Sequence, residues 1–143
     1  NVAWTRHDFR NALAHFGTAL RLAPWNPMHW GNMGLVRRDL GEPEAAIAAF
    51  CVALGLDAAY APALNEWANV LCDTGQYEQA LPLYDAALAI DDTRAVVYHN
   101  KGVCLRHLGR LPEAVGYFKA ALARDPHYHY SLEELRRLSG CPQ

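Results

Sequence analysis

The sequence predicts an all-α fold in which pairs of antiparallel helices follow one another as copies of one unit. The chain has 143 residues and matches itself when it is shifted by 34 residues. In every copy an alanine, an aromatic residue and a second alanine recur at helical spacing, at Ala12, Ala46, Ala80 and Ala114, then Phe16, Phe50, Tyr84 and Phe118, then Ala19, Ala53, Ala87 and Ala121. A unit of this length accommodates two helices and a turn, so we expect a solenoid of helix hairpins.

The first helix of each unit carries a small residue where two helices must approach closely. That position is held by Gly34, Ala68 and Gly102. A position without bulk allows the two helices of one hairpin to pack tightly. Glycines recur again at the expected ends of the first helices, at Gly41, Gly75 and Gly109. Glycine tolerates the positive φ that commonly ends a helix, so these residues mark the turns.

These residues resemble the tetratricopeptide repeat (TPR) family over nearly the whole chain. The resemblance implies a right-handed superhelix of antiparallel helix pairs with a C-terminal capping helix. It places a TPR array over residues 1–128, with a truncated repeat at 1–26 and full repeats at 27–60, 61–94 and 95–128, and a capping helix and tail over 129–143. Because the sequence starts within a repeat and lacks an initiating Met, we expect it to be a piece of a longer protein.

Two residues depart from the pattern. Lys101 occupies the position of Met33 and Trp67, so we expect its stem to snorkel towards water. Pro82 lies several residues into a second helix, where it removes a backbone donor and predicts a tolerated kink near the start of the helix.

Composition excludes several functional classes. The net charge of −2 and the pI near 6.4, without a basic stripe, predict no nucleic-acid surface. No segment approaches the roughly 20 apolar residues that a membrane span needs. The cysteines, Cys51, Cys72, Cys104 and Cys141, form no CxxC pair, so we expect no disulfide framework. This weakly favours a cytoplasmic location, although a missing upstream segment leaves the compartment open.

Catalytic and metal-binding patterns are not found in the sequence. It contains no glycine-rich phosphate loop, nucleophile elbow or HExxH motif. His99, His107 and Cys72, or His127 with His129, match no established zinc spacing. We therefore predict a non-enzymatic chain without a cofactor or metal site.

The candidate binding residues lie on the first helices. In the TPR family these helices line a concave groove, and helical spacing selects the residues that point into it. The predicted peptide-binding residues are Asn32, Leu35, Arg38, Asn65, Asn69, Val96, His99, Asn100, Val103 and Arg106.

Amide side chains in this set suggest the kind of ligand. Each amide both donates and accepts hydrogen bonds, so a row of them suits an extended main chain. The resemblance implies this role for Asn32, Asn69 and Asn100, while a role in bonding neighbouring helices stays equally open for Asn32 and Asn100. Arg38 and Arg106 are equivalent and suit a carboxylate or phosphate.

The function predicted from the sequence is a non-catalytic protein–protein interaction module that binds an extended peptide segment of a partner protein. Two alternatives remain: a self-associating scaffold that assembles as a homo-oligomer through solenoid ends, and a recruiting or regulatory arm of a larger enzyme. Relatives that clamp chaperone tails have a Lys and an Asn where this chain has Gly31 and Leu35, which disfavours that ligand.

Overall fold

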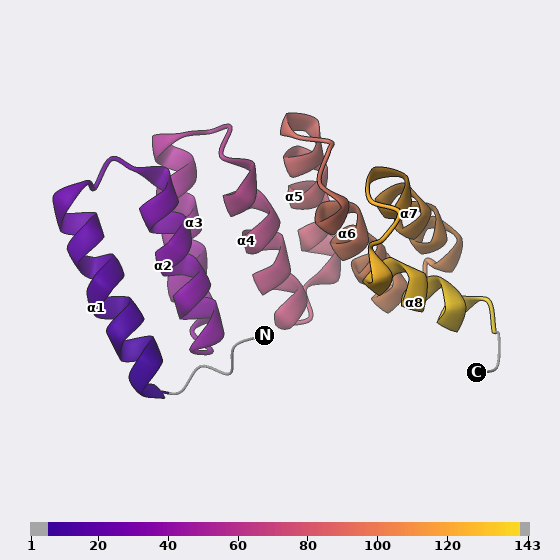
Figure 1. Ribbon diagram of the computed structural model, residues 1–143, viewed down its shortest axis with the longest axis horizontal. Coiled ribbons are helices and arrows are strands. Elements are labelled where there is room, and N and C mark those ends of the chain that lie inside the picture. Colours follow the sequence, from indigo (N-terminus) through magenta and orange to yellow (C-terminus); the bar gives the residue numbers. More distant parts are fainter. Residues whose placement is uncertain (1–5, 141–143) are drawn as a thin grey trace. The chain divides into compact units, whose positions relative to one another are not determined.

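A computed structural model describes residues 6–140, with side chains from residue 10 onward. The described part contains eight helices and no strand, so the all-α prediction is confirmed (Figure 1). The helices are α1 (Arg6–Leu22), α2 (Pro27–Asp39), α3 (Pro43–Leu56), α4 (Ala61–Asp73), α5 (Tyr77–Ile90), α6 (Ala95–His107), α7 (Leu111–Arg124) and α8 (His129–Leu138). The helix tail predicted at residues 1–4 and Cys141 lie outside the described residues.

The helices follow the 34-residue period. The first helices of the three full repeats are α2, α4 and α6, and the second helices are α3, α5 and α7. The chain divides into two compact units, an N-terminal unit that ends at Val70 and a C-terminal unit that begins at Leu71. In the N-terminal unit α2 packs against α1 and α3, and in the C-terminal unit α6 packs against α5 and α7, which in turn contacts α8.

The predicted glycine turns have the expected backbone geometry. Gly41, Gly75 and Gly109 have φ values of 77°, 80° and 77°. At the first of these turns the Gly41 N–H donates to the Arg38 carbonyl, and the Glu42 N–H donates to the Arg37 carbonyl at 2.9 Å. These bonds satisfy carbonyl groups that the end of a helix leaves unpaired.

The glycines inside the first helices lie where helices meet. A Cβ added at Gly34 would lie 2.4 Å from Cε1 of Phe50, and one added at Gly102 would lie 2.7 Å from Cε1 of Phe118. No Cβ tolerates such a distance without movement of its neighbour. The prediction that this position requires a small residue is confirmed.

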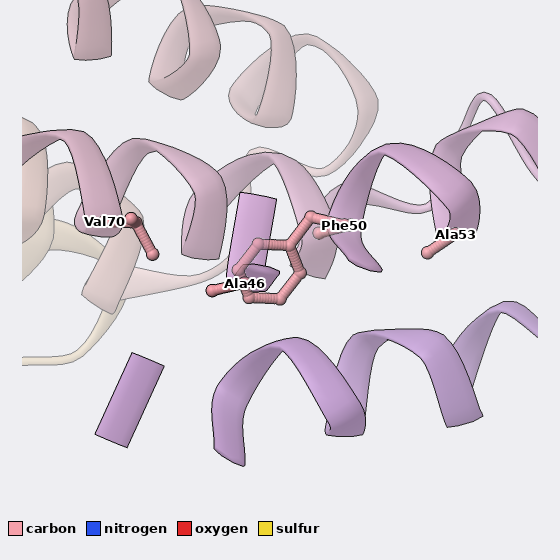
Figure 2. Packing of buried hydrophobic residues seen from close by; sticks show 5 residues of the cluster. Ala46, Phe50, Ala53 and Val70 are labelled. Atoms are coloured by element: carbon pink, nitrogen blue, oxygen red, sulfur yellow. The ribbon is translucent and has the colours of Figure 1, made fainter. Parts of the chain in front are cut away.

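The core of the N-terminal unit surrounds Phe50, which is fully buried. Ala46 and Ala53 lie one turn to either side of it on α3, and Val70 joins the cluster from α4 (Figure 2). Partly buried side chains, including Trp30 and Trp67, pack around this cluster. The recurring alanines and aromatic residues are therefore the contact surface between helices.

Pro82 lies on the exposed side of α5, and the helix continues through it from Tyr77 to Ile90. The proline ring lacks an N–H and so leaves the carbonyl of Glu78 without its usual helical donor. Its exposure limits the cost, because water reaches the backbone on that side.

Lys101 does not snorkel as expected. The residue is only 7% exposed, and its ammonium group donates to the carboxylate of Asp85 and to the hydroxyl of Tyr117 at 2.7 Å. Burial by itself lowers the pKa of Lys101, but the hydrogen bonds to Asp85 and Tyr117 outweigh it and hold the pKa above its usual value. The snorkelling prediction was wrong because α5 and α7 supply partners before the stem reaches water.

Candidate functional site

The candidate residues of the N-terminal unit lie on α2 and α4. On α2, Leu35 is 37% exposed, and Asn32 and Arg38 are half-buried on the same helix. On α4, Asn69 is half-buried as well. These four residues form the exposed part of the first helices in this unit, and we call them the α2–α4 face.

Asn65 does not belong to this face. It is only 4% exposed, and its side-chain nitrogen donates to Oε1 of Glu66 at 3.5 Å. The equivalent residue of the preceding repeat, Gly31, is also buried, and a Cβ there would lie 3.2 Å from the ring of Tyr60. This repeat position points into the protein, so we remove Asn65 from the candidate ligand contacts.

Arg38 is paired with a carboxylate of the chain itself. Its Nη1 lies 3.2 Å from Oε2 of Glu66, one first helix further along the chain. The side chain of Asn69 donates to the same oxygen at 3.4 Å. Glu66 therefore joins α2 to α4 and fixes two of the predicted binding residues.

Arg106 repeats this arrangement in the C-terminal unit. Its Nε lies 3.0 Å from Oε2 of Glu134 on α8, and both atoms are buried. The contact is an ion pair without the geometry of a hydrogen bond. Arg137 adds a second positive charge, with Nη1 3.4 Å from Oε1 of Glu134.

The two glutamates were missed from the sequence, although a signal was present. Each follows its arginine by 28 residues, from Arg38 to Glu66 and from Arg106 to Glu134. Opposite charges at the same offset in two repeats indicate contact between consecutive first helices. This recurrence could have identified both pairs.

His99 forms part of a packed aromatic cluster rather than an open surface. Its Nδ1 lies 2.9 Å from Oγ of the buried Ser131 on α8. Its ring centroid lies 5.3 Å from that of Tyr128 and 5.4 Å from that of Phe118. Burial lowers the pKa of His99, and the positive charge of Arg106 opposes protonation further, whereas Glu134 favours it. His99 is therefore neutral at pH 7 and joins α6 to α7 and α8.

The remaining candidates of the C-terminal unit lie along α6. Val96, Asn100 and Val103 are each half-buried. They present partly exposed apolar and amide groups on a first helix, as Leu35 and Asn32 do on α2. Together with Arg106 they form what we call the α6 face.

Nothing in residues 10–140 gathers three or more side chains of the kinds that hold a metal ion. Within the described range, no helix combines the length and the apolar character that a membrane crossing requires.

The architecture defines the chain as a protein of repeated helix hairpins. Sequence profiles of the tetratricopeptide repeat match residues 1–61 and 60–127. The chain therefore belongs to the tetratricopeptide repeat family. Domains of this family are protein–protein interaction modules and are generally non-catalytic.

Solved structures support the fold. The crystal structure of PilW, a widely conserved type IV pilus biogenesis factor, is 28% identical with a TM-score of 0.85, and the match covers 93% of this chain and 62% of PilW. MamA from Desulfovibrio magneticus RS-1 is 23% identical with a TM-score of 0.79, over 94% of this chain and 76% of that protein. This chain thus spans less than two thirds of PilW.

A third similar structure contains a ligand. The first TPR domain of Spaghetti (RPAP3), bound to the HSP90 peptide SRMEEVD, is 18% identical with a TM-score of 0.76, and the match covers 80% of this chain and 90% of that domain. At this identity the likeness concerns the fold. No curated protein sequence matches the chain.

Proposed function

We propose that this chain binds an extended peptide segment of a partner protein along the exposed faces of its first helices. The observation that carries the proposal is the side-chain pattern of these faces. On α2, the exposed Leu35 lies in the same helix as the half-buried Asn32, and on α6 the half-buried Val96 and Val103 accompany Asn100. Apolar contacts and amide groups together suit a peptide held by its main chain.

The internal ion pairs indicate how the proposed ligand is recognised. Arg38 and Arg106 already contact Glu66 and Glu134. A ligand carboxylate or phosphate would have to compete with these glutamates, and the buried Glu134 would lose its partner. We therefore propose that the arginines hold consecutive first helices together, and that the amides and apolar groups contact the ligand.

Comparison with the peptide-bound TPR domain is consistent with the proposal, because the same fold accommodates a peptide there. The nature of that peptide is not transferred. Position 31 is a buried glycine against Tyr60, and position 35 is an exposed leucine. Neither offers the charged and amide groups expected for an acidic C-terminal tail, so we propose a different class of peptide.

The test is affinity capture with the whole chain as bait, followed by mass spectrometry. The comparison bait carries Asn69→Ala and Asn100→Ala. A matched control carries Asn11→Ala and Gln79→Ala, which remove exposed amides from the helices α1 and α5. We expect a partner that the wild type and the control retain and the Asn69/Asn100 variant loses. A partner retained equally by all three baits would contradict the proposal.

The mode of recognition has its own test. Synthetic peptides that cover the captured segment are compared with copies N-methylated at single backbone positions. Because the amides are proposed to contact the ligand main chain, N-methylation at several positions should weaken binding. Affinity that depends only on the ligand side chains would contradict main-chain recognition.

Self-association is a second candidate because large apolar side chains are exposed around the turn from α1 to α2. Leu22 and Trp25 are 75% and 69% exposed. An exposed aromatic and aliphatic pair is a suitable contact for a second copy. Light scattering should then show a mass that rises with concentration and falls in Trp25→Ser, whereas a constant monomer mass would exclude this candidate.

A further inference from the structure

Two cysteines of the C-terminal unit lie side by side. Cys72 is in the last turn of α4 and Cys104 is in α6. Their thiols are hydrogen-bonded to each other. Cys104 is fully buried and its thiol donates to the Tyr77 carbonyl at 3.1 Å, while Sγ of Cys72 lies 3.5 Å from the hydroxyl of Tyr84. Backbone and side-chain contacts thus hold both sulfur atoms in place.

The two thiols differ in access and in acidity. Cys72 is partly exposed, whereas Cys104 is not. The hydrogen bond with Cys72, followed by burial and by the negative charge of Glu78, raises the pKa of Cys104 far above its usual value, against the opposing charge of Lys101. Cys104 therefore keeps its proton while Cys72 forms the attacking thiolate.

Repeat symmetry gives this pair a structural place. Cys72 occupies the position that Arg38 and Arg106 occupy in the repeats on either side. Those arginines contact the next first helix through Glu66 and Glu134. In the middle repeat, a thiol contact between α4 and α6 replaces the ion pair.

We propose that Cys72 and Cys104 form a reversible dithiol–disulfide pair that a small disulfide, such as oxidised glutathione, oxidises. This pair is a modification site separate from the proposed peptide-binding faces. Neither Cys51, which is exposed on α3, nor Cys141 takes part in it.

The reaction proceeds by two exchange steps. The Cys72 thiolate attacks one sulfur of oxidised glutathione, the disulfide of the oxidant breaks, and one glutathione thiolate leaves and takes up a proton. Cys104 then loses its proton to solvent, its sulfur attacks the Cys72 sulfur, and the second glutathione leaves. Two electrons and two protons pass from the protein thiols to the oxidant. The second step is the slower one, because the buried Cys104 gives up its proton reluctantly.

Closure of the disulfide would enclose α5 in a covalent loop between α4 and α6. A cross-link of this kind removes conformational freedom from the unfolded chain. We therefore expect the oxidised protein to melt at a higher temperature than the reduced protein.

The experiment uses the whole chain with Cys51→Ser and Cys141→Ser, so that only the pair remains. It is incubated with oxidised glutathione at about pH 8, near the ordinary pKa of a thiol, and analysed by intact mass and peptide mapping. The expected product has lost two hydrogen atoms, contains a peptide that links Cys72 to Cys104, and returns to the starting mass with dithiothreitol. An unchanged mass, or a glutathione adduct that never resolves to the linked peptide, would overturn the proposal.

A further variant separates the two roles. Cys104→Val introduces the residue that the equivalent positions Val36 and Val70 already have, so the helices should pack as before. In this background Cys72 should stop at the glutathione adduct. Cys72→Ala should prevent reaction at Cys104, and rapid modification of Cys104 in that variant would contradict the assigned order of attack.

Discussion

Substitution of Gly34 by alanine tests the packing of the repeat most sharply. The new Cβ would lie 2.4 Å from Cε1 and 2.8 Å from Cδ1 and Cζ of Phe50. The ring of Phe50 is fully buried and has no open space into which to move. Overpacking of a core costs about 1–3 kcal/mol, and the short distance favours the upper end of that range. Alanine regains about 1 kcal/mol of helix propensity over glycine, so we expect a net loss of about 2 kcal/mol.

The assay is urea unfolding followed by circular dichroism, with Gly17→Ala as the matched control. Gly17 lies inside α1, and an added Cβ there has no described atom within 4 Å. The control should therefore gain about 0.5–1 kcal/mol from reduced backbone freedom. Gly102→Ala, with a distance of 2.7 Å to Phe118, should be destabilising as well. If Gly34→Ala is as stabilising as Gly17→Ala, the close approach of the two helices is refuted.

Three further predictions concern charged and titratable groups. Lys101→Met should leave stability at pH 7 within about 1 kcal/mol of wild type, and only the wild type should lose stability above about pH 10.5, because the folded state, through Asp85, raises the pKa of Lys101; equal alkaline loss in both would contradict this. His99 has a lowered pKa in the folded state, so its contribution is present above about pH 6.5 and is lost as the pH falls below it. The melting temperature should then drop on acidification more in wild type than in His99→Gln, and equal drops would refute the burial of a neutral ring. Arg106→Met should cost about 1–3 kcal/mol in thermal unfolding, since it leaves the buried Glu134 with only the exposed Arg137; a cost below about 0.3 kcal/mol would exclude a structural ion pair.

The sequence predicted those features that the 34-residue period determines. Phe50 and Phe118 recur with their alanine neighbours because every hairpin has the same contact surface. Gly34 and Gly102 are glycines because those rings leave no room for a Cβ. The helix ends followed in the same way from the turn glycines, whose positive φ is a local property of the backbone.

Side-chain pairing between helices was harder to predict. Lys101 was expected in water and found buried, because its partners Asp85 and Tyr117 lie on two other helices. Asn65 was expected on the exposed face, but a rotation of a fraction of a turn suffices to bury a helical residue. Such contacts depend on the rotation of one helix against the next, which a single sequence does not specify.

Arg38 shows the same limit and also its remedy. Its charge was correctly taken as a site for a carboxylate, but the carboxylate is that of Glu66 in the same chain. Only the recurrence of the same offset between Arg106 and Glu134 carries this information in the sequence. Comparison between repeats thus replaces part of what the helix rotation would otherwise have to provide.

The account's central claim, peptide binding by the amides of the first helices, is tested most directly by one affinity comparison. Fluorescence anisotropy is recorded with a labelled peptide of the captured partner segment, for the wild type, Asn69→Ala/Asn100→Ala and the Asn11→Ala/Gln79→Ala control, with circular dichroism to verify folding. Loss of two hydrogen-bonding side chains at about 1 kcal/mol each should weaken binding by about tenfold or more, whereas the control should bind like the wild type. Equal affinity of all three folded proteins would contradict the claim.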